Sequence, residues 1–93
     1  MITFNIDTEE EVAVEIEQDN AHTLMLYNDD VNTFDHVIES LIEVCNHDML
    51  QAEQVAWIVH TKGKCDVKHG DRNRLEKMCL QLLDRKLSAV IEQ

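Results

Sequence analysis

The stretch HTLMLYNDDVNTFDHVIESLIEVC, residues 22–45, decides the fold. Its first six residues, His22 to Tyr27, form a short apolar run that favours a buried strand. A polar turn follows at residues 28–30, and Asn32 or Thr33 is a suitable N-cap for a helix that runs to about Cys45. The apolar positions of that helix recur at spacings of three and four: Phe34, Val37, Ile38, Leu41 and Cys45.

A second helix is predicted directly after the first. Asp48 with Gln51 three residues later forms a capping-box pattern, and Gly63 follows the last turn as a terminator, so we expect a helix from there to about Thr61. Its inner stripe has mostly small side chains, which lets a neighbouring helix approach closely: Ala52, Val55, Ala56 and Val59.

The last third of the chain predicts a strand, a helix and a strand. The first strand lies around Cys65 and Val67, Asp71 caps the helix, and residues 87–91 close the chain as a strand. The order β-α-α-β-α-β indicates the α+β class. We expect a small two-layer sandwich in which a short, mostly antiparallel sheet packs on three helices.

Charge restricts the range of partners. The sequence has 93 residues, enough for one small domain, and a formal net charge of −11. Residues 1–61 carry fourteen Asp and Glu and no Lys or Arg, whereas residues 62–93 hold all eight basic residues and five acidic ones. Nucleic-acid binding and attachment to anionic lipid both need clustered basic residues, so we expect neither nucleic acid nor a membrane as partner.

The N-terminal residues differ from the remainder in composition. Residues 1–20 are strongly acidic, yet Val12, Val14 and Ile16 alternate with other residues as in a strand. We therefore expect an acidic extension over residues 1–20, either flexible or folded as a hairpin, and a core domain over residues 21–93.

The three cysteines indicate the compartment. Their number is odd and their spacing wide, and no signal peptide or apolar span is apparent, so we expect free thiols and a cytoplasmic protein. A metal site could be drawn from Cys45, His47, His60 and Cys65, but these spacings match no zinc pattern. We expect no metal and no cofactor.

Two polar features remain unexplained by periodicity. Asn28-Asp29-Asp30 follows the first strand, where a simple turn and helix entry is the ordinary interpretation. His60 lies near the end of an otherwise apolar helix, where it could serve as a partner of the helix dipole.

Together these residues resemble a known family. The segments Leu26-Tyr-Asn-Asp-Asp30, Val37-Ile38 and Val59-His60-x-x-Gly63-Lys64 resemble the ClpS family over residues 22–65, and the resemblance thins toward the C-terminus. The family consists of adaptors that carry N-degron substrates to the ATP-dependent Clp protease. The resemblance implies a binding site rather than a catalyst.

The same resemblance implies the site residues. Asn28, Asp30 and His60 would hold the substrate's α-amino group, with Asp29 assisting nearby. An α-ammonium with a pKa of roughly 7.7–8.0 presents three donors, which an amide oxygen, a carboxylate and a neutral imidazole can accept. The pocket for the first side chain would be lined by Tyr27, Asn32, Phe34, Val37, Ala56, Val59 and Leu87.

This pocket departs from the family pattern. Family members commonly have Thr at the position of Asn32 and Met at the positions of Phe34 and Ala56. Phe34 makes one wall bulkier and Ala56 makes the other less bulky, and we hypothesise that these two changes in volume compensate. The alternative is that Phe34 simply fills the pocket.

The implied unfoldase partner is the N-terminal domain of ClpA or its relative ClpC. The segment Lys64–Leu87 looks shorter than in relatives, so no docking residues are assigned. Two rival functions remain. One is an enzyme with an Asp30–His60 dyad and Cys45 or Cys65 as nucleophile. The other is an acidic interaction module that binds basic partners without N-degron recognition.

Overall fold

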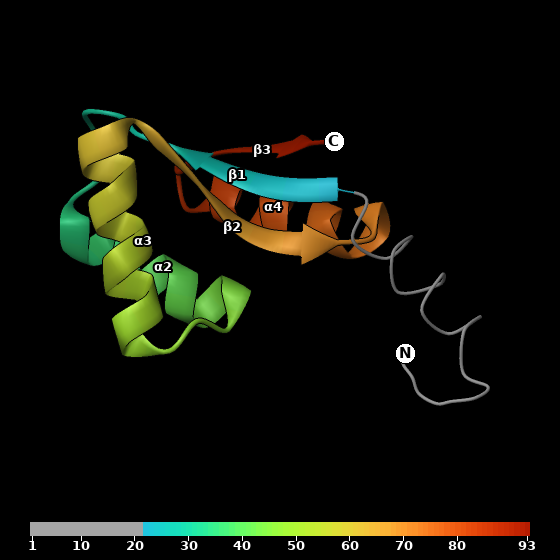
Figure 1. Ribbon diagram of the computed structural model, residues 1–93, viewed down its shortest axis with the longest axis horizontal. Helices are drawn as coiled ribbons and strands as arrows, with labels where there is room; N and C mark the ends of the chain where they lie inside the picture. The colour runs from blue at the N-terminus through green and yellow to red at the C-terminus, as the bar shows by residue number, and fades with distance from the viewer. Residues whose placement is uncertain (1–21) are drawn as a thin grey trace, which may run out of the picture.

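The structure is a computed structural model, and it describes residues 22–93. The elements, in chain order, are β1 (His22–Tyr27), α2 (Phe34–Cys45), α3 (Met49–Lys62), β2 (Lys64–Gly70), α4 (Arg72–Asp84) and β3 (Ser88–Glu92) (Figure 1). The predicted order and the α+β class are confirmed. The expected extension over residues 1–20, with its alternative of a hairpin, lies outside the described residues.

The sheet has three strands in the order β2-β1-β3, and both pairings are antiparallel. Tyr27 at the end of β1 pairs with Lys64 on one side and with Ser88 on the other. The central strand therefore ends between the start of β2 and the start of β3, and the loop that follows it emerges at this edge.

The helices begin at the predicted caps. Thr33 Oγ1 accepts a hydrogen bond from the His36 amide at 3.0 Å, which satisfies a free donor of the first turn of α2. Asp48 and Asp71 cap α3 and α4 in the same way. Gly63 ends α3 with φ +98°, a left-handed conformation that glycine adopts without a steric penalty.

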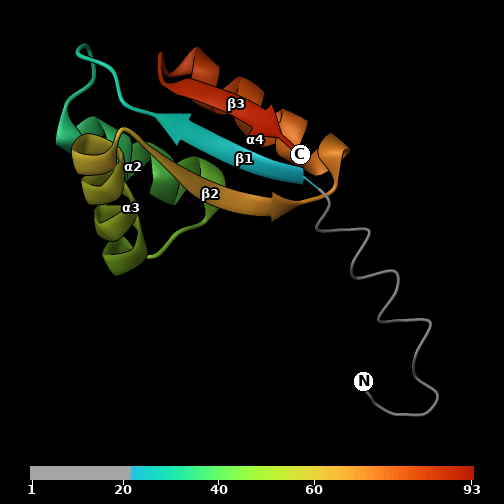
Figure 2. The same cartoon turned by 45° about the horizontal axis from the view of Figure 1, so that its top comes forward.

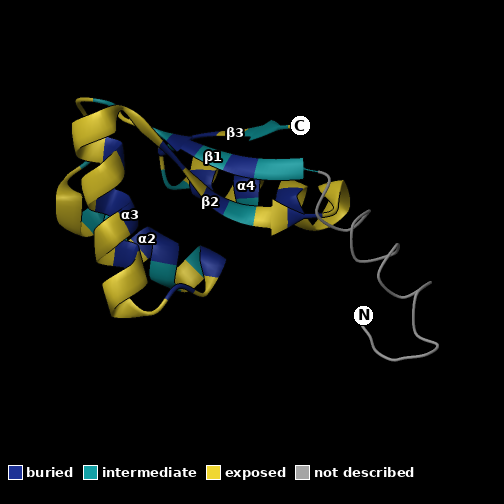
Figure 3. Ribbon diagram, in the orientation of Figure 1, coloured by how far each residue is buried: buried dark blue, intermediate teal, exposed yellow. Residues whose placement is uncertain are grey.

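The helices cover one face of the sheet. Helix α4 lies against β1 and β3, while α2 and α3 pack together at the end of the sheet where β1 ends and β2 begins (Figure 2). Leu24 and Leu26 of β1, Leu41 of α2 and Leu82 of α4 are almost fully buried in the core between the layers. The outer face of α3 is exposed (Figure 3).

The turn between α2 and α3 is anchored to the sheet by a buried histidine. A ring nitrogen of His47, Nε2, lies 2.9 Å from the carbonyl oxygen of Val67 in β2. Because this contact joins the helical pair to an edge strand, it helps to fix α3 relative to the sheet. Within residues 22–93, no helix is long and apolar enough to cross a bilayer.

Candidate functional site

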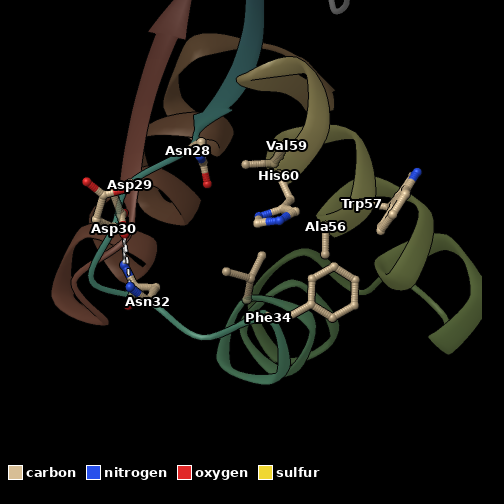
Figure 4. Close-up of a pocket in the computed structure, with 10 residues that line it drawn as sticks. Asn28, Asp29, Asp30, Asn32, Phe34, Ala56, Trp57, Val59 and His60 are labelled. Atoms are coloured by element: carbon tan, nitrogen blue, oxygen red, sulfur yellow. Dashed lines mark hydrogen bonds between the residues drawn. The ribbon is translucent and has the colours of Figure 1, made fainter.

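An open pocket of about 590 Å³ lies between the loop after β1 and the facing surfaces of α2 and α3 (Figure 4). Its polar side comes from the loop and from His60 of α3, and its apolar side comes from the two helices. The lining residues are Asn28, Asp29, Asp30, Asn32, Phe34, Val37, Ala56, Trp57, Val59 and His60. The structure thus brings together nine of the eleven predicted site residues.

A backbone contact joins the loop to the end of α3. The amide of Asn28 donates to the carbonyl oxygen of Gly63 at 2.9 Å, and the Gly63 amide donates to the Val59 carbonyl at 3.0 Å. The Asn28 side chain and the His60 ring therefore enter the same hollow from different elements (Figure 4). The Asp30 side chain is exposed and forms no salt bridge within residues 22–93.

Asp29 organises the loop. Its Oδ1 accepts hydrogen bonds from the amides of Val31 and Asn32, both at 3.0 Å, and its Oδ2 accepts one from the Ser88 hydroxyl at 3.2 Å. Burial raises the pKa of Asp29, but hydrogen bonds from Asn32, Val31 and Ser88 outweigh this effect and hold the pKa below its ordinary value. The carboxylate is thus occupied by its own loop, and its predicted contact with a substrate amine stays a prediction.

Asn32 connects this loop to the turn before β3. Its side-chain nitrogen donates to Asp29 Oδ2 at 2.9 Å and to the carbonyl oxygen of Lys86 at 2.8 Å. Asn32 therefore lines the pocket as predicted, while its amide group is directed to the protein rather than to the hollow.

The apolar wall contains the two positions that differ from the family pattern. Phe34 begins α2, and its ring lies beside Ala56 of α3 and near Trp57 (Figure 4). A ring beside an alanine is the arrangement that the compensation hypothesis predicts, and the hollow is still present. The compensation hypothesis and its alternative, that Phe34 fills the pocket, both stay predictions that peptide binding tests.

Trp57 is a pocket residue that the sequence analysis missed. It is 60% exposed, and its ring centroid lies 6.4 Å from that of His60. The available signal was its spacing, because Trp57 stands one turn before His60 and directly after Ala56 on the same helix.

Two predicted pocket residues line a small hollow that adjoins the large pocket. Tyr27 and Leu87 border this hollow of about 20 Å³, which shares five lining residues with the large pocket: Asn28, Asp29, Asn32, Val37 and Val59. The Tyr27 hydroxyl instead donates to Glu92 Oε2 in β3, a hydrogen bond that raises the pKa of Tyr27 together with burial and the Glu92 charge. Tyr27 follows the buried Leu26, so alternation along β1 turns it away from the helices. Leu87 is buried in the core.

Most of the chain, including the segments that form the pocket, matches a known protein family. The family model for the ATP-dependent Clp protease adaptor protein ClpS matches residues 17–89. The chain belongs to the ClpS family. The resemblance inferred from the motifs around Asp30 and His60 is therefore confirmed, and the family is one of adaptors rather than of enzymes.

Solved structures show the same fold. The chain is similar to Agrobacterium tumefaciens ClpS2 bound to L-phenylalaninamide, with a TM-score of 0.73 and 22% sequence identity, over 76% of this chain and 93% of that chain. At this identity the likeness concerns the ClpS fold alone. No match is found among curated protein sequences.

The cysteines of this ClpS-family chain lack the properties of nucleophiles. All three are free and buried. Burial raises the pKa of Cys45 to about 11, and burial with the nearby Asp66 charge raises that of Cys65, so both thiols stay protonated at neutral pH. No cluster of three or more metal-ligating side chains occurs within residues 22–93.

Proposed function

We propose that this protein binds polypeptides that have a free α-amino group and a bulky hydrophobic first side chain, and that it delivers them to a Clp AAA+ unfoldase-protease. The observation that carries this proposal is the pocket itself, in which acceptor groups on one side face apolar walls on the other. Family membership supports the delivery step.

The polar side suits an ammonium group. The Asn28 carboxamide oxygen, the Asp30 carboxylate and the His60 imidazole are acceptors from three residues, and a protonated α-amino group has three donors. Each hydrogen bond to the charged group contributes about 1.5–3 kcal/mol. Acetylation removes the charge and two donors, so an acetylated chain should be rejected.

The apolar side suits a large first side chain. Phe34, Val37, Ala56 and Val59 line it, and burial of a Leu or Phe side chain contributes about 1.5–3 kcal/mol. The ligand of ClpS2, L-phenylalaninamide, combines a free amine with an aromatic side chain, which is the chemistry proposed for this pocket. After the costs of association, we expect micromolar affinity, about −8 kcal/mol.

The proposed partner is the N-terminal domain of a ClpA- or ClpC-type unfoldase in the cytoplasm. In this proposal residues 21–93 form the adaptor core and residues 1–20 the acidic extension. The exposed basic residues of α4, Arg72, Arg74 and Lys77, would face an acidic unfoldase surface.

The test is a titration with Phe-, Leu-, Tyr- and Trp-initiated peptides, each with a free and an acetylated N-terminus. We expect binding of free chains, loss of binding on acetylation, and at least tenfold weaker binding to His60→Ala. The control His69→Ala removes an exposed histidine on β2, outside the pocket.

Failure of all four free peptides would overturn the proposal. Binding that weakens with salt but ignores acetylation would favour the acidic interaction module instead.

A further inference from the structure

A second hollow continues along the same two helices. It measures about 410 Å³ and has an apolar floor made by Ile38, Ile42 and Met49. Ile38 and Ile42 are half-buried, and Met49 at the start of α3 is 57% exposed. A floor of three aliphatic side chains open to solvent is a surface that gains free energy when an apolar group covers it.

The rim of this second hollow is acidic on both sides. Asp35 and Glu39 stand one turn apart on α2, and Glu53 stands on α3. Within residues 22–93 these three carboxylates form no salt bridge, whereas Glu43, which also borders the hollow, is paired with Arg85. The rim therefore presents unneutralised negative charge next to apolar surface.

The two hollows are neighbours. Asp35 directly follows Phe34, and Glu53 lies one turn before Ala56 and Trp57, so the rim of the second hollow begins where the wall of the first ends. On α3, His60 stands seven positions after Glu53, about 10 Å along the helix axis. An extended chain covers that distance in about three residues.

We propose that the substrate chain is read beyond its first residue, and that residues 3–5 lie in this second hollow when the amino group is held near His60. The occupant favoured there has an aliphatic side chain beside a lysine or arginine. This inference rests on the proposed function, because the first pocket must hold the amino end.

The test uses Phe-initiated peptides that differ only at residues 3–5. One has Leu and Lys there, a second has Leu and Glu, and a third has Ser and Lys. At low salt we expect the Leu–Lys peptide to bind about fivefold to tenfold more tightly than the Leu–Glu peptide and severalfold more tightly than the Ser–Lys peptide. The charge-dependent difference should shrink with added salt.

Variants of the acidic rim test whether the preference for lysine arises at the second hollow. Glu39→Gln and Glu53→Gln should each reduce the preference for Lys over Glu by about twofold to fivefold, while binding of a peptide with Ser at all three positions stays unchanged. Asp84→Asn is the matched control, since it removes one exposed negative charge at the end of α4 from a residue that does not line this hollow.

The outcomes separate this inference from the proposed function. Equal binding of all free Phe peptides, or an equal effect of Asp84→Asn, would overturn the inference and leave the proposed function intact. Equal binding of the Leu–Lys peptide with a free and an acetylated end would show that the hollow takes a separate basic partner, and would overturn it too. If no free peptide binds, both fail.

Discussion

Asn32 and Lys86 stand 54 residues apart in the chain, yet the side-chain nitrogen of Asn32 lies 2.8 Å from the main-chain oxygen of Lys86. The same nitrogen lies 2.9 Å from Asp29 Oδ2. One side chain thus ties the loop after β1 to the turn before β3. Lys86 has φ +72°, so this turn is itself a left-handed bend. We call the Asp29–Asn32–Lys86 contacts the loop clamp.

Removal of the loop clamp should weaken peptide binding more than it weakens the fold. Asn32→Ala deletes the hydrogen bonds to Asp29 and Lys86, so the loop that carries Asn28 and Asp30 loses its fixed position. We expect about tenfold lower affinity for a Phe-initiated peptide and a small fall in Tm, measured by fluorescence anisotropy and thermal unfolding. Asn73→Ala on the exposed surface of α4 is the control. Unchanged affinity of Asn32→Ala would contradict a positioning role.

Acid should release the loop clamp. The pKa of Asp29 is lowered from 3.8 in the folded protein, so its ionised form stabilises the fold above the unfolded-state pKa, and this contribution is lost as the pH falls through the folded-state pKa. The free energy of unfolding should therefore decline below about pH 4, and Asp29→Asn should flatten that decline.

A second carboxylate contributes to the same decline in the free energy of unfolding at acid pH. The pKa of Asp66 is also lowered, chiefly by its hydrogen bond from His69. Asp66→Asn should therefore remove a separate part of the acid dependence and leave the part due to Asp29. Urea unfolding between pH 5 and pH 2 measures both. If the free energy of unfolding of Asp29→Asn has the same pH profile as that of the wild type, part of the acid dependence cannot be assigned to Asp29.

The pairing of Phe34 with Ala56 is testable by a double-mutant cycle. Ala56→Met adds volume beside the Phe34 ring, and overpacking of this kind costs about 1–3 kcal/mol, so a Phe-initiated peptide should bind about tenfold more weakly. Phe34→Met combined with Ala56→Met restores the family residues and should recover most of that affinity. Additive effects of the two changes would show that the positions do not compensate.

Gly63 should be needed because the backbone at the end of α3 is left-handed there, and not because a side chain would collide with a neighbour. A Cβ added there meets no atom within 4 Å, but φ +98° is strained for an L-residue by about 1–2 kcal/mol. Gly63→Ala should therefore lower the Tm, by about 4–8 °C for each kcal/mol. Gly63→Asn should lower it less, because asparagine tolerates left-handed backbone. Equal Tm values for both variants and the wild type would be inconsistent with this account.

The order of elements was predictable from the sequence because it depends on near neighbours. Period-two and helical apolar patterns identify strands and helices, and caps such as Thr33, Asp48 and Asp71 contact amides three residues away. The family motif was visible for a related reason, since the loop before α2 and the end of α3 carry it in two short segments. Nine predicted site residues therefore lie around one hollow.

Contacts between distant segments were decided only by the tertiary structure. Tyr27 belongs to the family motif, but its hydroxyl is held by Glu92 of β3, and the residue borders the small adjoining hollow instead of the large pocket. Trp57 lies outside the family motif, and it joins the site because α3 packs beside α2. Asn32 meets Lys86 only after α4 and β3 are in place. Local pattern follows from residues within one turn or one pleat, whereas a pocket depends on where whole elements pack, and no short segment specifies that.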